Sequence, residues 1–456
     1  MTVNDTLKYL NVDLPDDIRR AQMMGDYPEA IRLIDYRLAQ SNVPQCLRHS
    51  LTAHREIFLH IEEEFPYTVE DAVAIVQKDI PGFTWEEFQS LMDQRYVRWL
   101  CIRGEKRIFQ RFYSSLRVSV PNFGKEPSPD TELNPPVPRL DISMQKMKEA
   151  GSLTQRIRIR ATARLKDDQF VPGMFLRVHL PIPAACPQQS DIRIEKTWPE
   201  GGIAAPEDAA QRTICWETTL EENQEFGVEY SYLHTARYTD AYNGQGMPGV
   251  YDFDVQEQAP HIVFTPYIKA LCAELSDGIT DPLGKARAFY DFITLNMKYT
   301  YMPDYFVLEN IAENCAKNYN GDCGVFALLF ITLCRCAGIP AQWQSCMAAT
   351  PDSAGCHDWA RFYVEPYGWL YADPSFGISS NRLQKEERRQ FYFGNLDAYR
   401  MVANREFQAE FTIPKQHWRH DPYDNQTGEM ETTDRGFLSG EYVRRQEILC
   451  CEEVSN

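Results

Sequence analysis

Cys323 is the residue whose neighbours best suit it to do chemistry. It stands in the segment Asn320-Gly-Asp-Cys-Gly-Val-Phe-Ala, and a strongly apolar run follows it. That run predicts a buried helix over residues 322–337 with the cysteine in its first turn. A thiol at a helix N-terminus lies at the positive end of the helix dipole, which favours the nucleophilic thiolate. The N–H groups of the same turn could also face a developing oxyanion. The segment therefore predicts a nucleophilic cysteine.

A base and an orienting acid follow Cys323 along the chain. His357 comes 34 residues later, and Asp373 a further 16. The residues around both alternate as strands do, and Glu365-Pro-Tyr-Gly between them predicts a hairpin turn. Pairing the two strands about residue 365 places His357 opposite Asp373 on one face of the sheet. The carboxylate could then orient the imidazole, which predicts a cysteine–histidine–aspartate triad.

These blocks, in this order, resemble the transglutaminase-like superfamily of cysteine enzymes. The resemblance is carried by Gly321-Asp-Cys-Gly-Val-Phe-Ala with Arg335-Cys-Ala-Gly-Ile-Pro, by His357-Asp-Trp, and by Gly368-Trp-Leu-Tyr-Ala-Asp-Pro. It covers about residues 262–378 and implies a papain-like α+β core. It also implies that Cys323 is the nucleophile, that His357 is the general base and acid, and that Asp373 is the orienting acid.

The oxyanion site departs from the pattern of the animal cross-linking enzymes in this superfamily. Those enzymes use a tryptophan some way upstream of the nucleophile, whereas no tryptophan lies between Trp216 and Trp343 here. Tyr301 is the candidate to take that role. Trp359 shares the face of His357 by strand alternation. It is expected either to line the substrate cleft or to pack in the core.

The residues and the resemblance together favour a hydrolase. A cysteine enzyme of this kind forms a thioester and then passes the acyl group to water or to an amine. No Asp/Asn loop of the EF-hand type occurs, so calcium activation is not implied and protein cross-linking is less favoured. We therefore expect cleavage of an amide or peptide bond in a peptide or protein substrate. Two alternatives stay open: a protein-glutamine acyltransferase, and a non-catalytic peptide-binding scaffold with the same fold.

Metal binding is the other chemistry that this region raises. Five cysteines crowd it, namely Cys315, Cys334, Cys336, Cys346 and Cys356. None of them forms the Cys-x2-Cys pair that is typical of zinc sites. His417 and His420 lie in a polar stretch that predicts a solvated loop. We expect no metal site and no cofactor.

The elements ahead of the core predict a helical module and a linker. Residues 1–117 carry helical periodicity, and Thr68 and Thr84 each begin a capping box with an acid three residues later. Residues 118–150 hold six prolines between positions 121 and 138. Proline-rich polar segments are extended and semi-rigid, which predicts a linker.

Strand-like patterns begin at residue 151. The alternation of polar and apolar residues is clearest over 156–165, and short strands separated by turn residues continue to 240. They predict a small β-sandwich. Residues 241–415 form the predicted transglutaminase-like core, and residues 416–456 predict an irregular extension. The whole is expected to be an α+β multidomain protein.

Composition limits the classes of partner. The chain has 456 residues and a formal net charge of −18, which disfavours binding to nucleic acid or to an anionic membrane surface. The first residues show no signal-peptide pattern, and the thirteen cysteines are expected to be free thiols. A cytoplasmic location is the expectation that follows. The oligomeric state is left open.

Overall fold

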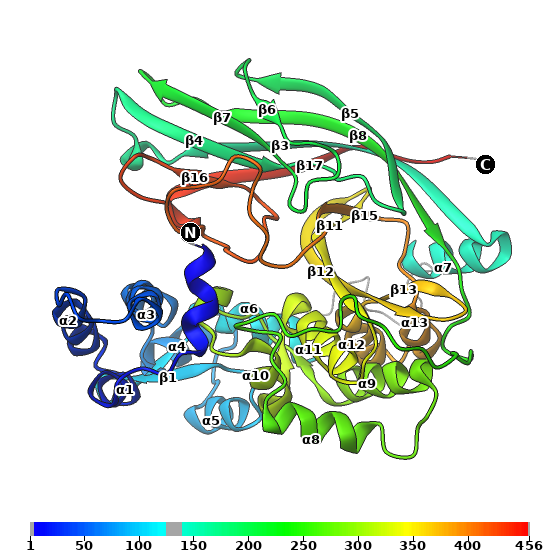
Figure 1. Ribbon diagram of the computed structural model, residues 1–456, viewed down its shortest axis with the longest axis horizontal. Coiled ribbons are helices and arrows are strands. Elements are labelled where there is room, and N and C mark those ends of the chain that lie inside the picture. The colour runs from blue at the N-terminus through cyan, green and yellow to red at the C-terminus, as the bar shows by residue number, and fades with distance from the viewer. Residues whose placement is uncertain (1–3, 125–138, 455–456) are drawn as a thin grey trace.

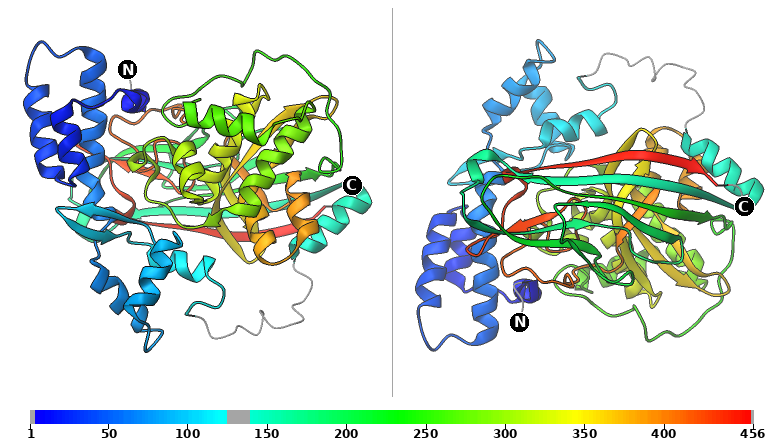
Figure 2. Two further views of the ribbon diagram at one scale, coloured as in Figure 1. Left: turned by 90° about the horizontal axis from the view of Figure 1, so that it is seen from below. Right: turned by 90° about the horizontal axis from the view of Figure 1, so that it is seen from above.

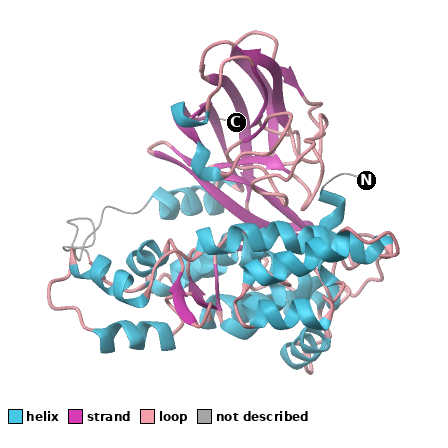
Figure 3. Ribbon diagram, turned by 90° about the vertical axis from the view of Figure 1, so that its left-hand side faces the viewer, coloured by secondary structure: helices cyan, strands magenta, loops and turns pink. Residues whose placement is uncertain are grey.

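The structure is a computed structural model that describes residues 4–124 and 139–454. Helices and several sheets alternate in the α+β multidomain arrangement that the sequence predicts. Two stacked sheets lie at one end of the molecule, and the helical module and the core lie side by side at the other (Figures 1 and 3). Within the described residues, no helix combines the length and apolar character needed to cross a membrane.

The N-terminal module is helical, as predicted. Its elements are η1 (Asn4–Asn11), α1 (Asp16–Met23), α2 (Tyr27–Leu38), α3 (Gln45–Glu64), α4 (Val69–Gln77), α5 (Trp85–Asp93), the hairpin β1 (Trp99–Ile102) and β2 (Glu105–Ile108), and α6 (Phe112–Ser119). The capping boxes at Thr68 and Thr84 are both present. Residues of α4 to α6 close a small core of their own around Phe88 and Phe112. The first helices instead share one continuous apolar cluster with the C-terminal half of the chain.

The linker prediction over residues 118–150 is wrong at its C-terminal end. Residues 139–150 form the helix α7 (Arg139–Ala150), which buries Met144 and Met147. The two methionines lie three residues apart on one face of the helix, a signal that the nearby prolines obscured. Five of the six prolines of the segment lie outside the described residues.

The predicted β-sandwich is present and has two four-stranded sheets. One has the order β17-β3-β8-β5 and the other β16-β4-β7-β6. The strands are β3 (Ser152–Leu165), β4 (Met174–Pro181), β5 (Gln189–Trp198), β6 (Ile203–Ala204), β7 (Thr213–Leu220), β8 (Phe226–Arg237), β16 (Glu429–Glu431) and β17 (Tyr442–Glu453). Alternate residues of β3, from Ile157 to Leu165, face the shared core, because successive side chains of a strand point to opposite faces.

The prediction that residues 416–456 are irregular is only partly right. Residues 419–428 and 432–438 form no helix or strand, but β17 is a twelve-residue strand. It pairs with β3 from Tyr442 opposite Leu165 to Glu453 opposite Gln155, and Figure 2 shows the two strands running side by side. The sequence of β17 has no clean alternation because both of its faces are only half-buried. The C-terminal segment is thus part of the sandwich.

The core places a buried helix against a five-stranded antiparallel sheet of order β14-β13-β12-β11-β15. The strands are β11 (Ala341–Thr350), β12 (Ser353–Val364), β13 (Gly368–Ala372), β14 (Phe393–Gly394) and β15 (Arg400–Asn404). The helices are α8 (Pro266–Leu275), α9 (Pro282–Asn296), α10 (Ile311–Asn318), α11 (Cys323–Cys336), α12 (Pro374–Arg382) and α13 (Glu386–Phe391). A short parallel pair, β9 (Lys298–Tyr299) and β10 (Asn320–Gly321), leads into α11. Phe330 of α11 packs on Phe362 of β12.

Candidate active site

Cys323 is the first residue of α11, as the sequence predicts. Asp322 caps the helix, and its carboxylate accepts a hydrogen bond from the N–H of Val325 at 3.3 Å. The side chain of Tyr305 donates a hydrogen bond to the same carboxylate. A Cβ atom added at Gly324 would lie 2.4 Å from the Tyr305 hydroxyl, so only glycine allows this close approach. These contacts fix the turn that carries the cysteine.

His357 and Asp373 form a buried pair. The distance between His357 Nε2 and Asp373 Oδ2 is 2.7 Å, and both side chains are almost completely shielded from solvent. Asp373 also caps α12, where its other oxygen accepts from the N–H of Phe376 at 2.9 Å. The carboxylate is therefore held by a backbone N–H as well as by the imidazole, and the ring has a fixed orientation.

The strand register differs from the predicted one by two residues. The last pairs of β12 and β13 join Val364 to Gly368 and Ala360 to Ala372, and the same register would continue with Trp359 opposite Asp373. His357 is therefore a diagonal neighbour of Asp373 rather than its direct partner. A shift of two residues keeps every side chain on its face, and for this reason the pair forms despite the wrong register.

Arg400, which the sequence analysis missed, stabilises the Asp373 carboxylate. Its guanidinium lies 2.8 Å from Asp373 and 2.6 Å from Asp397, and all three side chains are buried. Burial opposes ionisation of Asp373, but the charges of His357 and Arg400 hold the pKa of this carboxyl below its usual value. In the sequence, Arg400 shows only as a charged residue at the start of the short apolar strand β15. Asp373 is thus a fixed anion behind the imidazole.

The Cys323 thiol bonds to Asp358, the residue after His357. The thiol donates to Asp358 Oδ2 at 3.2 Å. Among the described residues, it forms no hydrogen bond with His357. Burial and the negative charges of Asp358 and Asp322 raise the pKa of the Cys323 thiol well above its usual value. The prediction of a thiolate favoured by the helix dipole is therefore wrong for this arrangement, because nearby carboxylates and burial outweigh the dipole.

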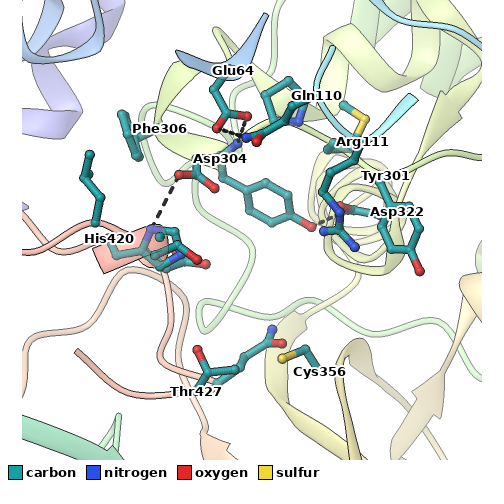
Figure 4. Close-up of a pocket in the computed structure, with 18 of the residues that line it drawn as sticks. Glu64, Gln110, Arg111, Tyr301, Asp304, Phe306, Asp322, Cys356, His420 and Thr427 are labelled. Carbon is teal, nitrogen blue, oxygen red and sulfur yellow. Dashed lines mark hydrogen bonds and ion pairs between the residues drawn. The ribbon is translucent and has the colours of Figure 1, made fainter. Parts of the chain in front are cut away.

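Two adjoining cavities contain the candidate residues. Cys323 and Asp358 line a cavity of about 970 Å³, and His357 lines a second of about 440 Å³. The two cavities share the residues Tyr299, Tyr301, Gly355 and Cys356. The larger one is walled by three parts of the chain, and Figure 4 shows Glu64, Asp304 and His420 facing into it from those parts. The thiol and the imidazole therefore open onto neighbouring spaces.

Comparison with known protein families finds a match in this part of the chain. The model of the transglutaminase-like superfamily matches residues 269–374. That span includes the helix start at Cys323, the strand with His357 and the turn with Asp373. The chain carries a transglutaminase-like core.

The solved structures that match this chain are distant. A candidate cysteine protease from Cytophaga hutchinsonii is 14% identical with a TM-score of 0.43, and the match covers 67% of this chain and 92% of that one. The periplasmic domain of TgpA from Pseudomonas aeruginosa is 14% identical with a TM-score of 0.27, covering 55% of this chain and 96% of that one. A candidate protease from Parabacteroides distasonis is 10% identical with a TM-score of 0.22, covering 50% and 60%. A search of curated proteins finds no match.

The two proposed cleft residues of the transglutaminase-like core have different surroundings. Tyr301 lines both cavities, and the guanidinium of Arg111 lies 3.7 Å from the centre of its ring. Trp359 is completely buried and lines neither cavity, and its Nε1 donates to Gln344 at 3.0 Å. Of the two alternatives for Trp359, packing in the core is the one that holds.

The larger cavity of the transglutaminase-like core is rich in carboxyl groups. Burial, with the charges of Glu64 and Glu429, raises the pKa of Asp304 to about 8. Burial likewise raises the pKa of Asp322 to about 6. His420 lies in this wall, with its Nδ1 3.5 Å from Asp304. The expected solvated loop is therefore a wrong description of His420, which the fold of residues 419–428 carries inward.

Metal ligation has no support in the described residues. Among residues 4–124 and 139–454, no three side chains of histidine, cysteine, aspartate or glutamate gather where they could hold a metal ion. All thirteen cysteines are free thiols.

Proposed function

We propose that the protein is a cysteine hydrolase that cleaves an amide or peptide bond through a thioester on Cys323. The observation that supports this most is the buried hydrogen bond of 2.7 Å between His357 and Asp373. With Asp373 ionised, the His357 Nε2 donates the proton of that bond. In the neutral form of the imidazole, Nδ1 is then the acceptor that a base requires. Cys323 begins a helix that packs on the same strand.

The reaction requires the thiol to leave Asp358 and approach His357. Thiol–imidazole pairs are often loose in unliganded enzymes and tighten when substrate binds. The Cys323 proton then passes to His357 Nδ1 while sulfur bonds to the carbonyl carbon. The C–N bond breaks, and the leaving amine takes the proton. Water next gives a proton to His357 and attacks the thioester, and the C–S bond breaks to return the thiol.

The substrate is proposed to be a peptide or protein. A cavity of about 970 Å³ with walls from three parts of the chain is at the upper end of the volumes that hold drug-sized ligands. Backbone N–H groups of the first turn of α11 are the proposed oxyanion donors, with Tyr301 as an additional candidate in the shared wall.

Hydrolysis and amine transfer are separated by one assay. The protein is incubated with N-protected glutaminyl-glycine and with casein peptides, with and without a labelled primary amine. We expect ammonia release or new peptide termini by mass spectrometry, and little amine incorporation. Amine incorporation without hydrolysis would support the acyltransferase alternative.

Variants connect that activity to the proposed residues. Cys323→Ala and His357→Gln are each expected to lower the rate by about 10³-fold or more, since removal of one member of such a triad disables the whole unit. Cys101→Ala, which removes an exposed thiol, is the control and should keep full activity. Absence of both reactions in the unaltered protein, or their persistence in Cys323→Ala, contradicts the proposal and favours the scaffold.

A further inference from the structure

Asp358 is a buried carboxylic acid that the triad does not use. It follows His357 on β12, and only 3% of it is exposed. One of its oxygens accepts the Cys323 thiol at 3.2 Å. The other accepts from the side-chain amide of Gln426. Both oxygens are therefore occupied, one by the proposed nucleophile and one by a residue of the C-terminal segment.

Gln426 is itself held in place by a network of buried polar groups. Its amide nitrogen also donates to Asp424 at 2.8 Å, and Asp424 accepts from the hydroxyl of Ser345. Asn404 donates to that hydroxyl at 3.1 Å. A buried network in which every member has a partner is rigid and specific. The position of Asp358 is thus set by β11, β15 and the loop 419–428 together.

We propose that Asp358 is a positioning residue that retains the Cys323 thiol in a resting orientation, and that Gln426 fixes Asp358 for this task. The inference rests on the function proposed above in taking Cys323 as the nucleophile. In this arrangement the thiol proton is shared with Asp358 instead of passing to His357. Gln426 lines the same cavity as Cys323. A substrate that enters this cavity therefore reaches both the thiol and the Gln426–Asp358 pair that restrains it.

The surroundings of the pair oppose a thiolate. Asp322 and Asp424 act on Cys323 or Asp358. Four further groups feel the charge of Cys323 or Asp358 in turn, and all are phenols or thiols: Tyr299, Tyr305, Cys346 and Cys356. The cations Arg98 and Arg111 act on Asp322, one step away. Burial raises the pKa of Asp358 well above its usual value, as does the charge of Asp424. A negative group beside a thiol disfavours its ionisation, so removing Asp358 should release the thiolate.

The test is the pH profile of alkylation at Cys323, measured with iodoacetamide and residue-resolved mass spectrometry. In the unaltered protein, Cys323 is expected to react more slowly at pH 7 than the exposed Cys46 and Cys101. Asp358→Asn should move the profile to lower pH and speed labelling at pH 7 by about tenfold, because the carboxyl group 3.2 Å from the sulfur, which raises the pKa of the thiol, is replaced by an amide that cannot ionise. Asp352→Asn removes an exposed charge from the turn between β11 and β12 and should leave the profile unchanged.

A second variant covers the case in which Asp358→Asn does not fold. Gln426→Met keeps the length of the side chain but removes both N–H donors, so it should speed Cys323 labelling in the same direction by a smaller factor. Unchanged or slower labelling in either folded variant overturns the proposal. Loss of both labelling and hydrolysis in Asp358→Asn also overturns it, because Asp358 would then be the base.

Failure of this inference is distinguishable from failure of the hydrolase proposal. Labelling is read without substrate. Faster labelling in the variants, combined with no hydrolysis in any protein, supports the positioning role and removes the enzyme proposal. Hydrolysis that depends on His357, combined with a labelling profile insensitive to Asp358, supports the hydrolase proposal and removes the positioning role of Asp358.

Discussion

At the scale of single residues, Arg400 has the most consequence for the site. It is completely buried between Asp373 and Asp397, and its guanidinium also lies 4.4 Å from the ring centre of Phe376. Two buried carboxylates would repel each other without a cation between them. The His357–Asp373 pair therefore depends on a third charge that lies outside the proposed triad.

Replacing Arg400 by methionine should destabilise the fold strongly. It leaves two buried carboxylates with no cation, and breaking a buried pair in this way costs about 3–5 kcal/mol in the free energy of unfolding. Urea denaturation followed by tryptophan fluorescence measures this cost. Arg405→Met is the control, because the Arg405 side chain makes an exposed hydrogen bond to the carbonyl of Asp208, and the change should alter stability by less than about 0.5 kcal/mol. Equal effects would show that Arg400 is not required.

The pH dependence of that cost has a definite sign. Burial opposes ionisation of Asp373 and Asp397, but Arg400 and its neighbours hold the pKa of each carboxyl below its unfolded value of 3.8. Their stabilisation is thus present above pH 4 and is lost as pH falls through the folded pKa values. In Arg400→Met, burial acts without the cation and raises the pKa values of both carboxyl groups. Lower pH then protonates these buried carboxylates and recovers part of the lost stability. The stability gap between the two proteins should narrow from pH 7 to pH 5, and a widening gap contradicts the assignment.

At the scale of elements, α11 is positioned by glycine and by its cap. Tyr305 lies against Gly324 and bonds to the capping Asp322, so one tyrosine locks the turn that bears Cys323. The strand β12 then presents Asp358 and His357 one residue apart. Helix and strand together bring the thiol to the carboxyl group of Asp358, while the imidazole of His357 opens onto the adjoining cavity.

Gly324→Ala tests the close approach of Tyr305. The new Cβ would lie 2.4 Å from the Tyr305 hydroxyl and 2.8 Å from the ring of Trp343. Overpacking of this kind costs about 1–3 kcal/mol, and the displaced tyrosine should lower hydrolysis as well. Gly440→Ala is the matched control for stability alone, since an added Cβ there meets nothing within 4 Å, although Gly440 lines the larger cavity. Thermal unfolding and the peptide assay read both effects, and a fully active, fully stable Gly324→Ala protein would refute the role of Tyr305.

The sequence predicted the elements of the core better than their mutual placement. The helix beginning at Cys323 and the two strands follow from local periodicity, and the His357–Asp373 pair needed only the correct face of a strand. Arg400, Asp358 and Gln426 could not be predicted, because their roles arise from contacts between segments far apart in the chain. The same holds for β17, whose partner β3 lies across the whole core in sequence.

At the scale of the molecule, the helical module docks on the segment that leads into α11. Arg98 donates to Asn320 at 3.1 Å, and Asn320 donates in turn to the carbonyl of Arg95 at 2.9 Å. Ser115 accepts from the N–H of Tyr301 at 3.0 Å. The module also supplies Glu64 and Arg111 to the larger cavity. The helical module therefore forms part of the wall of the candidate site.

Arg98→Met should loosen this docking. Arg98 is buried deeply enough that its pKa falls to about 10, and hydrogen bonds to charged groups contribute about 1.5–3 kcal/mol each. We expect faster hydrogen exchange at residues 298–302 and 320–323, with the sandwich unaffected. Arg103→Met, which breaks the exposed pair with Glu62 at 3.0 Å, should leave exchange there unchanged. Protection that persists in Arg98→Met argues against a docked module.

The pairing of β3 with β17 makes the candidate site a late product of synthesis. Cys451 and Gln155, which contact each other across that pair, lie 296 residues apart, so a ribosome must translate the entire core between them first. The loop with Gln426 gains a further anchor when the second of these strands is in place, because Tyr442 donates a 2.9 Å hydrogen bond to the carbonyl of Gly428. A nascent chain halted before β17 would thus lack one of the contacts that hold the loop of Gln426, the residue proposed to fix Asp358.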